Sequence, residues 1–118
     1  MALFNKKKSV ESEYIKAQTE MNKEPVKKAS ERILFDEITS DDQKTTYLVD
    51  MLAKHHPLVL NFERVDVPTA NKVLAFIAGA TYALNGKTIK IDEKIYLFAL
   101  SEEFLDNSLD EWIRFIKN

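Results

Sequence analysis

The apolar residues fall into short runs and helical stripes, and together these predict a compact domain from residue 32 onward. Short apolar runs at 33–35 and 58–62 have the length of buried strands, and two more runs form a hairpin around 88–98. Helical spacing covers 40–54, 67–84 and 108–117. The predicted order is therefore β-α-β-α-β-β-α. A strand–helix–strand unit joins parallel strands, so we expect an α/β (α+β) sandwich with helices packed on one small mixed sheet.

Capping residues place the ends of these helices. Residues 40–43 (SDDQ) and 108–111 (SLDE) have the spacing of a capping box. Asp66 precedes a proline in the first turn of the middle helix, which suits a helix start. Asn85 and Gly86 close that helix, and we expect Gly86 to take the left-handed conformation that ends many helices.

The middle helix carries no charge between Lys72 and Lys87. Its apolar residues lie on every side, and they are Val73, Leu74, Phe76, Ile77, Ala80, Tyr82 and Leu84. A helix that is apolar all round is covered all round. One interpretation is a homodimer in which this helix meets its own copy, with Gly79, Ala80 and Ala83 allowing close approach. The alternative is a central helix that is buried within a monomer.

Two registers are open for the hairpin. A three-residue loop at 92–94 separates the residues cleanly into two faces. The opposed pairs are then Lys90–Tyr96 and Thr88–Phe98 on one face, and Ile89–Leu97 and Ile91–Ile95 on the other. A two-residue loop at 93–94 would set Lys90 opposite Leu97 and mix the faces, so the first register is expected.

The face with Lys90 and Tyr96 combines one cation with aromatic rings. If this face points outward, it suits an acidic, partly apolar peptide, because rings supply buried area and the lysine supplies sign selectivity. The alternative is that another part of the chain covers the face, since aromatic strand faces usually belong to a core. Nucleic acid is a weaker candidate, because the face lacks a basic stripe.

Residues 1–31 differ from the rest, with many lysines and glutamates and few apolar residues, and they are expected to form a tail and linker. The tail begins with a short amphipathic group made of Leu3, Phe4, Lys6, Lys7 and Lys8. Two interpretations are open, a solvated N-terminus or a weak membrane anchor with the lysines near lipid phosphates. The globular domain is expected over 32–118.

Composition removes several classes of function. The chain has 118 residues, a net charge of -2 and no cysteine, which excludes disulfides, Cys-ligated zinc and thiol catalysis. No stretch has the roughly 18 apolar residues of a membrane span, so a cytosolic location is expected. His55 and His56 are adjacent and point apart on a helix, which makes a poor chelate. No phosphate loop, catalytic set, cofactor or metal site is predicted.

Several of these segments resemble the SepF family of cell-division proteins. They are PLVLNF at 57–62, ANKVLAFIAGATYALNG at 70–86, IKI at 89–91 and IYLF at 95–98. The family pattern is a strand ending V-N-L, a helix reading D-F-L-S-G-x-x-Y-A-x-x-G and a strand reading I-F-L. The resemblance covers roughly 32–100 and is most specific at 76–86. The start MALFNKKK also looks like the family's N-terminal membrane-binding helix.

The resemblance implies a non-enzymatic adaptor: a membrane-associated dimer at the division site that binds the C-terminal tail of FtsZ, the tubulin-like division protein, and aligns its filaments. The family's tail-binding positions fall on Lys90 and Tyr96, and the glycine linked to polymerisation falls on Gly86. Tyr96 replaces the usual Phe, and Ala78 stands where Ser is common. From the residues alone, the alternative is a small nucleic-acid- or ligand-binding α/β module.

Overall fold

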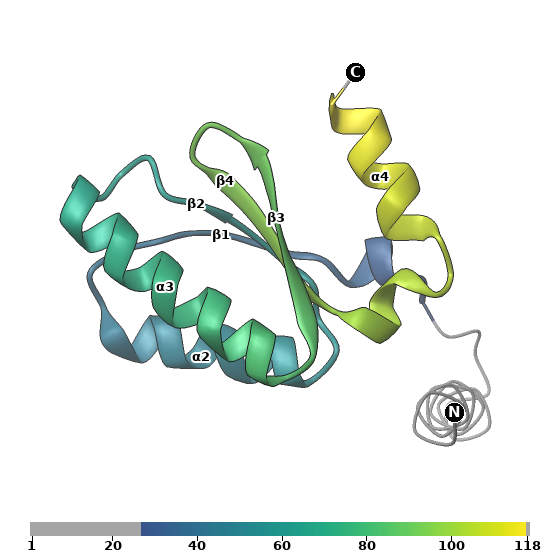
Figure 1. The fold of residues 1–118 in the computed structure, drawn as a ribbon, viewed down its shortest axis with the longest axis horizontal. Coiled ribbons are helices and arrows are strands. Elements are labelled where there is room, and N and C mark those ends of the chain that lie inside the picture. Colours follow the sequence, from purple (N-terminus) through teal and green to yellow (C-terminus); the bar gives the residue numbers. More distant parts are fainter. Residues whose placement is uncertain (1–26, 118) are drawn as a thin grey trace.

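The computed structural model describes residues 27–117, which form a four-stranded mixed sheet with helices on both faces (Figure 1). The strands are β1 (Leu34–Glu37), β2 (Leu58–Asn61), β3 (Gly86–Asp92) and β4 (Ile95–Leu100). Their order across the sheet is β1-β2-β4-β3. β1 and β2 are parallel, and β4 runs antiparallel to both of its neighbours. The predicted fold class and element order are confirmed.

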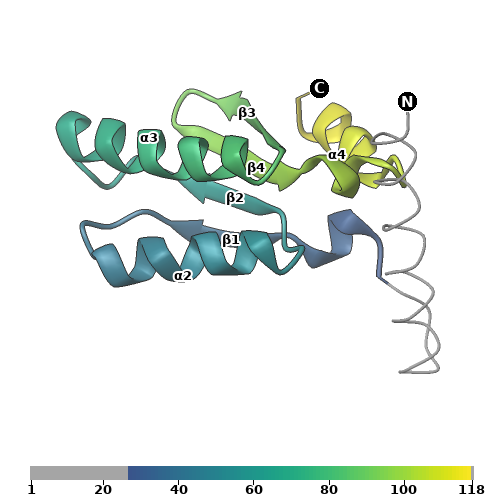
Figure 2. The same ribbon diagram turned by 60° about the horizontal axis from the view of Figure 1, so that its bottom comes forward.

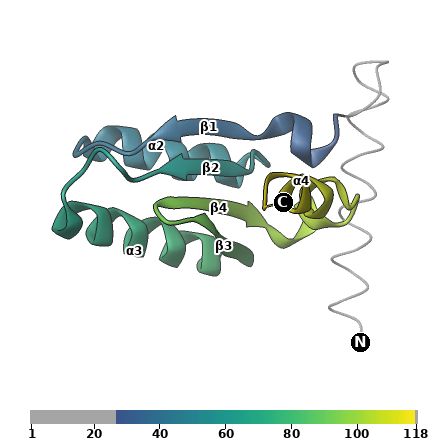
Figure 3. The ribbon, with the colours of Figure 1, turned by 90° about the horizontal axis from the view of Figure 1, so that it is seen from above.

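Two helices cover one face of the sheet and a third covers part of the other. α2 (Asp42–Ala53) and α3 (Val67–Ala83) run side by side (Figure 2), and α4 (Ser108–Lys117) lies at one end of the molecule (Figure 3). Short 3₁₀ turns, η1 (Ala29–Arg32) and η2 (Ser101–Phe104), flank the sheet. Ala29, which lies in η1 ahead of residue 32, is buried.

The two faces of the sheet have separate cores. The core beneath α2 and α3 is the larger, and it includes Ile38, Leu48, Leu52, Leu58, Leu60, Phe62, Val73, Ile77, Phe98 and Leu100. The core on the α4 side contains Ala29, Val59, Leu97, Ala99 and Leu109. Alternate residues of β2 and β4 therefore point into different cores, as the pleat of a strand requires.

The caps of α2 and α3 use aspartates. Asp41 accepts a hydrogen bond from the Gln43 backbone N–H at 2.9 Å, so the cap of α2 lies one residue after the predicted Ser40. Asp66 caps α3 through the Thr69 N–H at 3.1 Å, as predicted. This hydrogen bonding lowers the pKa of Asp66 from its ordinary value, because the bonds favour the charged carboxylate.

The prediction that Gly86 takes the left-handed conformation is wrong. Asn85 has a φ of 63° there, which asparagine tolerates, and Gly86 is the first residue of β3. Gly86 is required for a different reason. A Cβ at this position would lie 2.5 Å from the Ala99 carbonyl oxygen and 2.8 Å from the Thr81 Cγ2. The absence of a side chain therefore lets β3 leave α3 in close contact with β4.

The hairpin has the predicted pairs Thr88–Phe98, Ile89–Leu97 and Lys90–Tyr96, but the predicted pair Ile91–Ile95 and the predicted loop are wrong. Asp92 pairs with Ile95, so the turn is the two-residue Glu93–Lys94 rather than a three-residue loop. A shift between Lys90 and Asp92 then restores the pairing of Lys90 with Tyr96. Such a bulge adds one residue to one strand, which is why a two-residue turn does not mix the faces here.

Candidate functional site

Aromatic rings line the helix-covered side of the hairpin. Tyr96 lies edge-on to Phe62, with ring centroids 5.6 Å apart and planes at 86°, and its ring is 6.4 Å from that of Phe98. Phe98 is fully buried, whereas Tyr96 is half-buried. Of these rings, Tyr96 is the one that reaches the surface, from the start of β4.

The face with Lys90, Tyr96, Thr88 and Phe98 is not an outward face along its whole length. It is the side of the sheet that α3 covers, so the alternative interpretation is correct for Phe98. Phe98 belongs to the core and cannot touch a ligand. Lys90 and Thr88 are exposed, because β3 is the edge strand of the sheet.

A groove of about 140 Å³ opens between the start of α3 and the end of the hairpin. Its walls are mostly apolar, and the lining residues are Phe62, Val65, Val67, Ala70, Asn71, Leu74, Glu93, Lys94 and Tyr96. Lys90 does not line the groove, but it lies directly across the strands from Tyr96. An apolar groove with ring edges and nearby lysines can hold an apolar side chain of a peptide that also carries negative charge.

The sequence analysis missed the α3 wall of this groove. Asn71 and Leu74 are three residues apart on one side of the helix, and this spacing was the sequence feature that could have placed them on one wall. It did not point to Tyr96, because nothing in a single sequence fixes which side of α3 faces the hairpin.

The outer side of α3 is apolar and exposed. Val73, Ile77 and Thr81 face the sheet, while Phe76 and Tyr82 on the outer side are 53% and 83% exposed. Gly79 and Ala83 are also exposed and Ala80 is half-buried, and a Cβ at Gly79 would meet nothing within 4 Å. A crease of about 200 Å³ beside Phe76 separates α3 from α2. The predicted self-association residues thus share one surface, except Gly86, which is in β3.

Other predictions concern the start of the chain, membrane spans and metal binding. Leu3, Phe4, Lys6, Lys7 and Lys8 lie outside the described residues. Within 27–117 no helix is long and apolar enough to cross a membrane. In the same part of the chain, no cluster of three or more histidine and acidic side chains is arranged to hold a metal ion. His55 instead contacts Glu103, in a network described below.

A family model described as "Cell division protein SepF" matches residues 35–102, which is more than half of the chain. The chain belongs to the SepF family. The matched region runs from β1 into η2, so it contains the sheet except Leu34, together with α2, α3 and the Tyr96 groove, and it leaves α4 outside.

Individual SepF relatives agree with this assignment. The cell division protein SepF of Carboxydothermus hydrogenoformans is 35% identical over 65 residues, covering 55% of this chain and 47% of the relative. That of Symbiobacterium thermophilum is 35% identical over 75 residues, covering 64% of this chain and 36% of the relative. A sepF homolog of Cyanophora paradoxa is 46% identical over 50 residues, 42% of this chain and 46% of that protein. Each match spans less than half of the relative's length.

Proposed function

We propose that this SepF-family chain is a dimeric adaptor of the cell-division machinery that binds the C-terminal tail of FtsZ in the Tyr96 groove. The observation that carries the proposal is the half-buried ring of Tyr96 in an apolar groove, with the exposed Lys90 directly across the strands. This arrangement recognises a short acidic and apolar segment rather than a folded surface. The adaptor would work at the division site on the cytoplasmic side of the membrane, aligning FtsZ filaments without any catalytic step.

Apolar side chains in the groove and the charge of Lys90 would contribute to binding in different ways. An apolar side chain of the tail would displace water from Phe62, Leu74 and Tyr96, which is where most of the affinity would come from. Lys90 would attract the acidic part of the tail at the exposed edge of the sheet. Burial and sign selectivity would thus come from separate side chains.

A matched pair of lysines on β3 tests this assignment. Lys90 lies on the groove side, whereas the Lys87 ammonium sits 4.9 Å from the centre of the Phe104 ring on the α4 side. Calorimetric titration with an FtsZ C-terminal peptide should show binding weakened about tenfold by Lys90→Glu, equivalent to about 1.4 kcal/mol. The control Lys87→Glu should bind within twofold of the parent chain. Equal affinity of both variants would reject the groove.

The exposed side of α3 supports the dimer. Gly79 and Ala83 lie at helical spacing from Phe76 on the exposed side of α3, which allows two helices to pack closely, and the crease beside Phe76 offers room for a partner's side chain. Phe76→Lys should convert the dimer to a monomer in sedimentation velocity. Phe115→Lys changes an aromatic that is 80% exposed on α4 and should leave the dimer intact. A dimer that survives Phe76→Lys would exclude this interface.

Membrane attachment is proposed for the start of the chain. Leu3 and Phe4 would enter the acyl boundary and Lys6 to Lys8 would face lipid phosphates. Deletion of residues 1–8 should abolish flotation with vesicles that contain anionic lipid, and peptide binding should be unchanged. A full-length chain that never floats would refute the anchor.

A further inference from the structure

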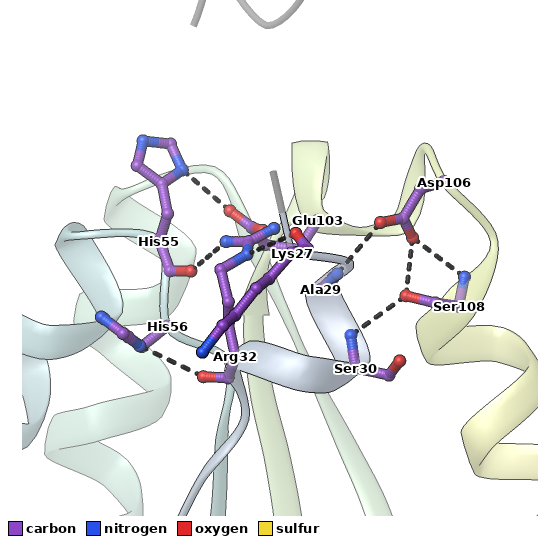
Figure 4. A network of polar contacts seen from close by, with 9 residues as sticks. All are labelled: Lys27, Ala29, Ser30, Arg32, His55, His56, Glu103, Asp106 and Ser108. Carbon is purple, nitrogen blue, oxygen red and sulfur yellow. Dashed lines mark hydrogen bonds and ion pairs between the residues drawn. The ribbon is translucent and has the colours of Figure 1, made fainter. Parts of the chain in front are cut away.

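A buried carboxylate joins three parts of the fold where the described chain begins (Figure 4). Glu103, in η2, has a side chain that is only 3% exposed. Its Oε1 lies 2.7 Å from Nη2 of Arg32 in η1, and its Oε2 lies 2.8 Å from Nδ1 of His55, just after α2. Arg32 also donates to the carbonyl oxygen of His55. The carboxylate is therefore held between side chains from two other elements.

The same turn, η1, is bound on its other side by the start of α4. Asp106 accepts hydrogen bonds from the Ala29 N–H at 3.0 Å and from the Ser108 N–H and hydroxyl at 2.9 and 2.7 Å. The Ser108 hydroxyl accepts in turn from the Ser30 N–H at 3.0 Å (Figure 4). Ser108 was predicted to cap its own helix, but its hydroxyl instead bonds to Asp106 and to the Ser30 N–H of η1. The latch, as we call it, consists of Arg32, His55, Glu103, Asp106 and Ser108.

The latch fixes two segments to the sheet. α4 places Leu109, Trp112 and Ile113 over the face that carries Val59 and Leu97, and both of those strand residues are buried. η1 is the point through which residues 1–26 join the domain. If the latch loosened, both segments would lose polar contacts that hold them, and the apolar face beneath α4 would become less well covered.

The latch contains an imidazole in a strongly charged setting. Among residues 27–117, the charged groups that act on His55 are Glu103 and Glu102 from η2 and Arg32 from η1. The hydrogen bond to Glu103 raises the pKa of His55 above its ordinary 6.5, burial opposes that rise, and the negative charge of both glutamates adds to it. The pKa of His55 therefore lies above that of an ordinary histidine, the side chain that commonly acts as a pH switch.

We propose that protonation of His55 fastens the latch, so that η1 and α4 are held firmly in mildly acidic solution and loosen as the imidazole loses its proton. With His55 charged, the buried carboxylate is bound between two cations. With His55 neutral, the attraction between its positive charge and the carboxylate is lost, and only the hydrogen bond remains. Glu103 then depends on Arg32 alone for neutralisation, and a buried carboxylate with less compensation is costly.

Linkage between proton binding and folding gives the direction in which the stability of the latch changes with pH. Because folding raises the pKa of His55, its contribution to stability is complete below the unfolded value near 6.5 and is lost as pH rises through the higher folded value. Each unit by which folding raises that pKa corresponds to a tenfold change in the opening equilibrium of the latch between low and high pH.

Hydrogen exchange on the full chain tests whether protonation of His55 fastens the latch. Protection factors, which remove the intrinsic effect of pH on exchange, would be measured for α4 and η1 from pH 5.5 to 9 in three chains. These are the parent, His55→Asn and His56→Asn. Asparagine tolerates the left-handed conformation of His55, whose φ is 72°. His56 is the matched control, because its Nδ1 meets the Arg32 carbonyl oxygen and not Glu103.

The expected result is protection of α4 and η1 that falls with rising pH in the parent and in His56→Asn, and that no longer depends on pH in His55→Asn. A pH-independent parent, or a His55→Asn variant that keeps the dependence, would overturn the proposal. If His55→Asn fails to fold, NMR titration of the parent decides. The indole N–H of Trp112, the single tryptophan of the chain, must then shift with the midpoint of the His55 imidazole. A different midpoint rejects the latch.

Discussion

The two glycines of the chain should respond to the same substitution with opposite signs. Gly79→Ala adds a methyl group that meets nothing within 4 Å, and it replaces glycine inside a helix. The free energy of unfolding should therefore rise by about 0.5–1 kcal/mol. Gly86→Ala places a Cβ 2.5 Å from the Ala99 carbonyl oxygen. That oxygen belongs to the β3–β4 ladder and cannot move away freely, so unfolding should become easier by about 1–3 kcal/mol.

Urea denaturation followed by the fluorescence of Trp112 measures both effects. Each chain would be unfolded at two protein concentrations, because self-association through the α3 surface would appear as a dependence on concentration. At the lower concentration we expect Gly79→Ala above the parent and Gly86→Ala below it, with unchanged slopes. A Gly86→Ala chain as stable as the parent would show that β3 does not pass β4 as closely as described, and the reasoning would fail.

Three further substitutions follow from the same contacts. Phe98→Ala should cost about 3–5 kcal/mol and unfold much of the population, because the ring is fully buried in the core beneath α3; circular dichroism against urea measures this. Ser108→Ala should cost about 1–3 kcal/mol in the same assay by leaving the Ser30 N–H without its acceptor, whereas the exposed Ser40→Ala should change little. Burial of the Asp106 carboxyl acts to raise its pKa. The hydrogen bonds from Ala29 and Ser108 outweigh this effect and lower the pKa from its ordinary 3.8. Its stabilisation is thus present above that value and lost in acid, so Asp106→Asn should be less stable than the parent at pH 7. In acid-unfolding curves this difference should shrink as the pH falls below 3.8.

Local patterns were sufficient for most of the fold. The apolar spacing and the capping residues predicted the strands β1 to β4 and the helices α2 to α4, because an amphipathic face and a capped end are properties of neighbouring residues. The hairpin shows where this reasoning stops. The register of Lys90 and Tyr96 followed from keeping the two faces separate, but a bulge next to Lys90, and not a longer loop, achieves it. Both solutions place the same residues on each face, so the sequence pattern does not distinguish them.

The remaining differences concern contacts between distant parts of the chain. Glu103 pairs with Arg32 and His55, which are far from it in sequence. Gly86 was assigned to the end of α3, whereas the constraint on this residue comes from the backbone of β4. Phe98 was placed on a binding face, whereas it is buried, and its burial depends on where α3 lies. None of these has a local signature.

The central claim, that the Tyr96 groove receives the FtsZ tail, is tested most directly by NMR. An unlabelled FtsZ C-terminal peptide would be titrated into the ¹⁵N-labelled full chain. The account predicts that the largest shift changes gather at Asn71, Leu74, Lys90, Lys94 and Tyr96. Changes centred on α4 and β1, or no saturable change at all, would contradict it.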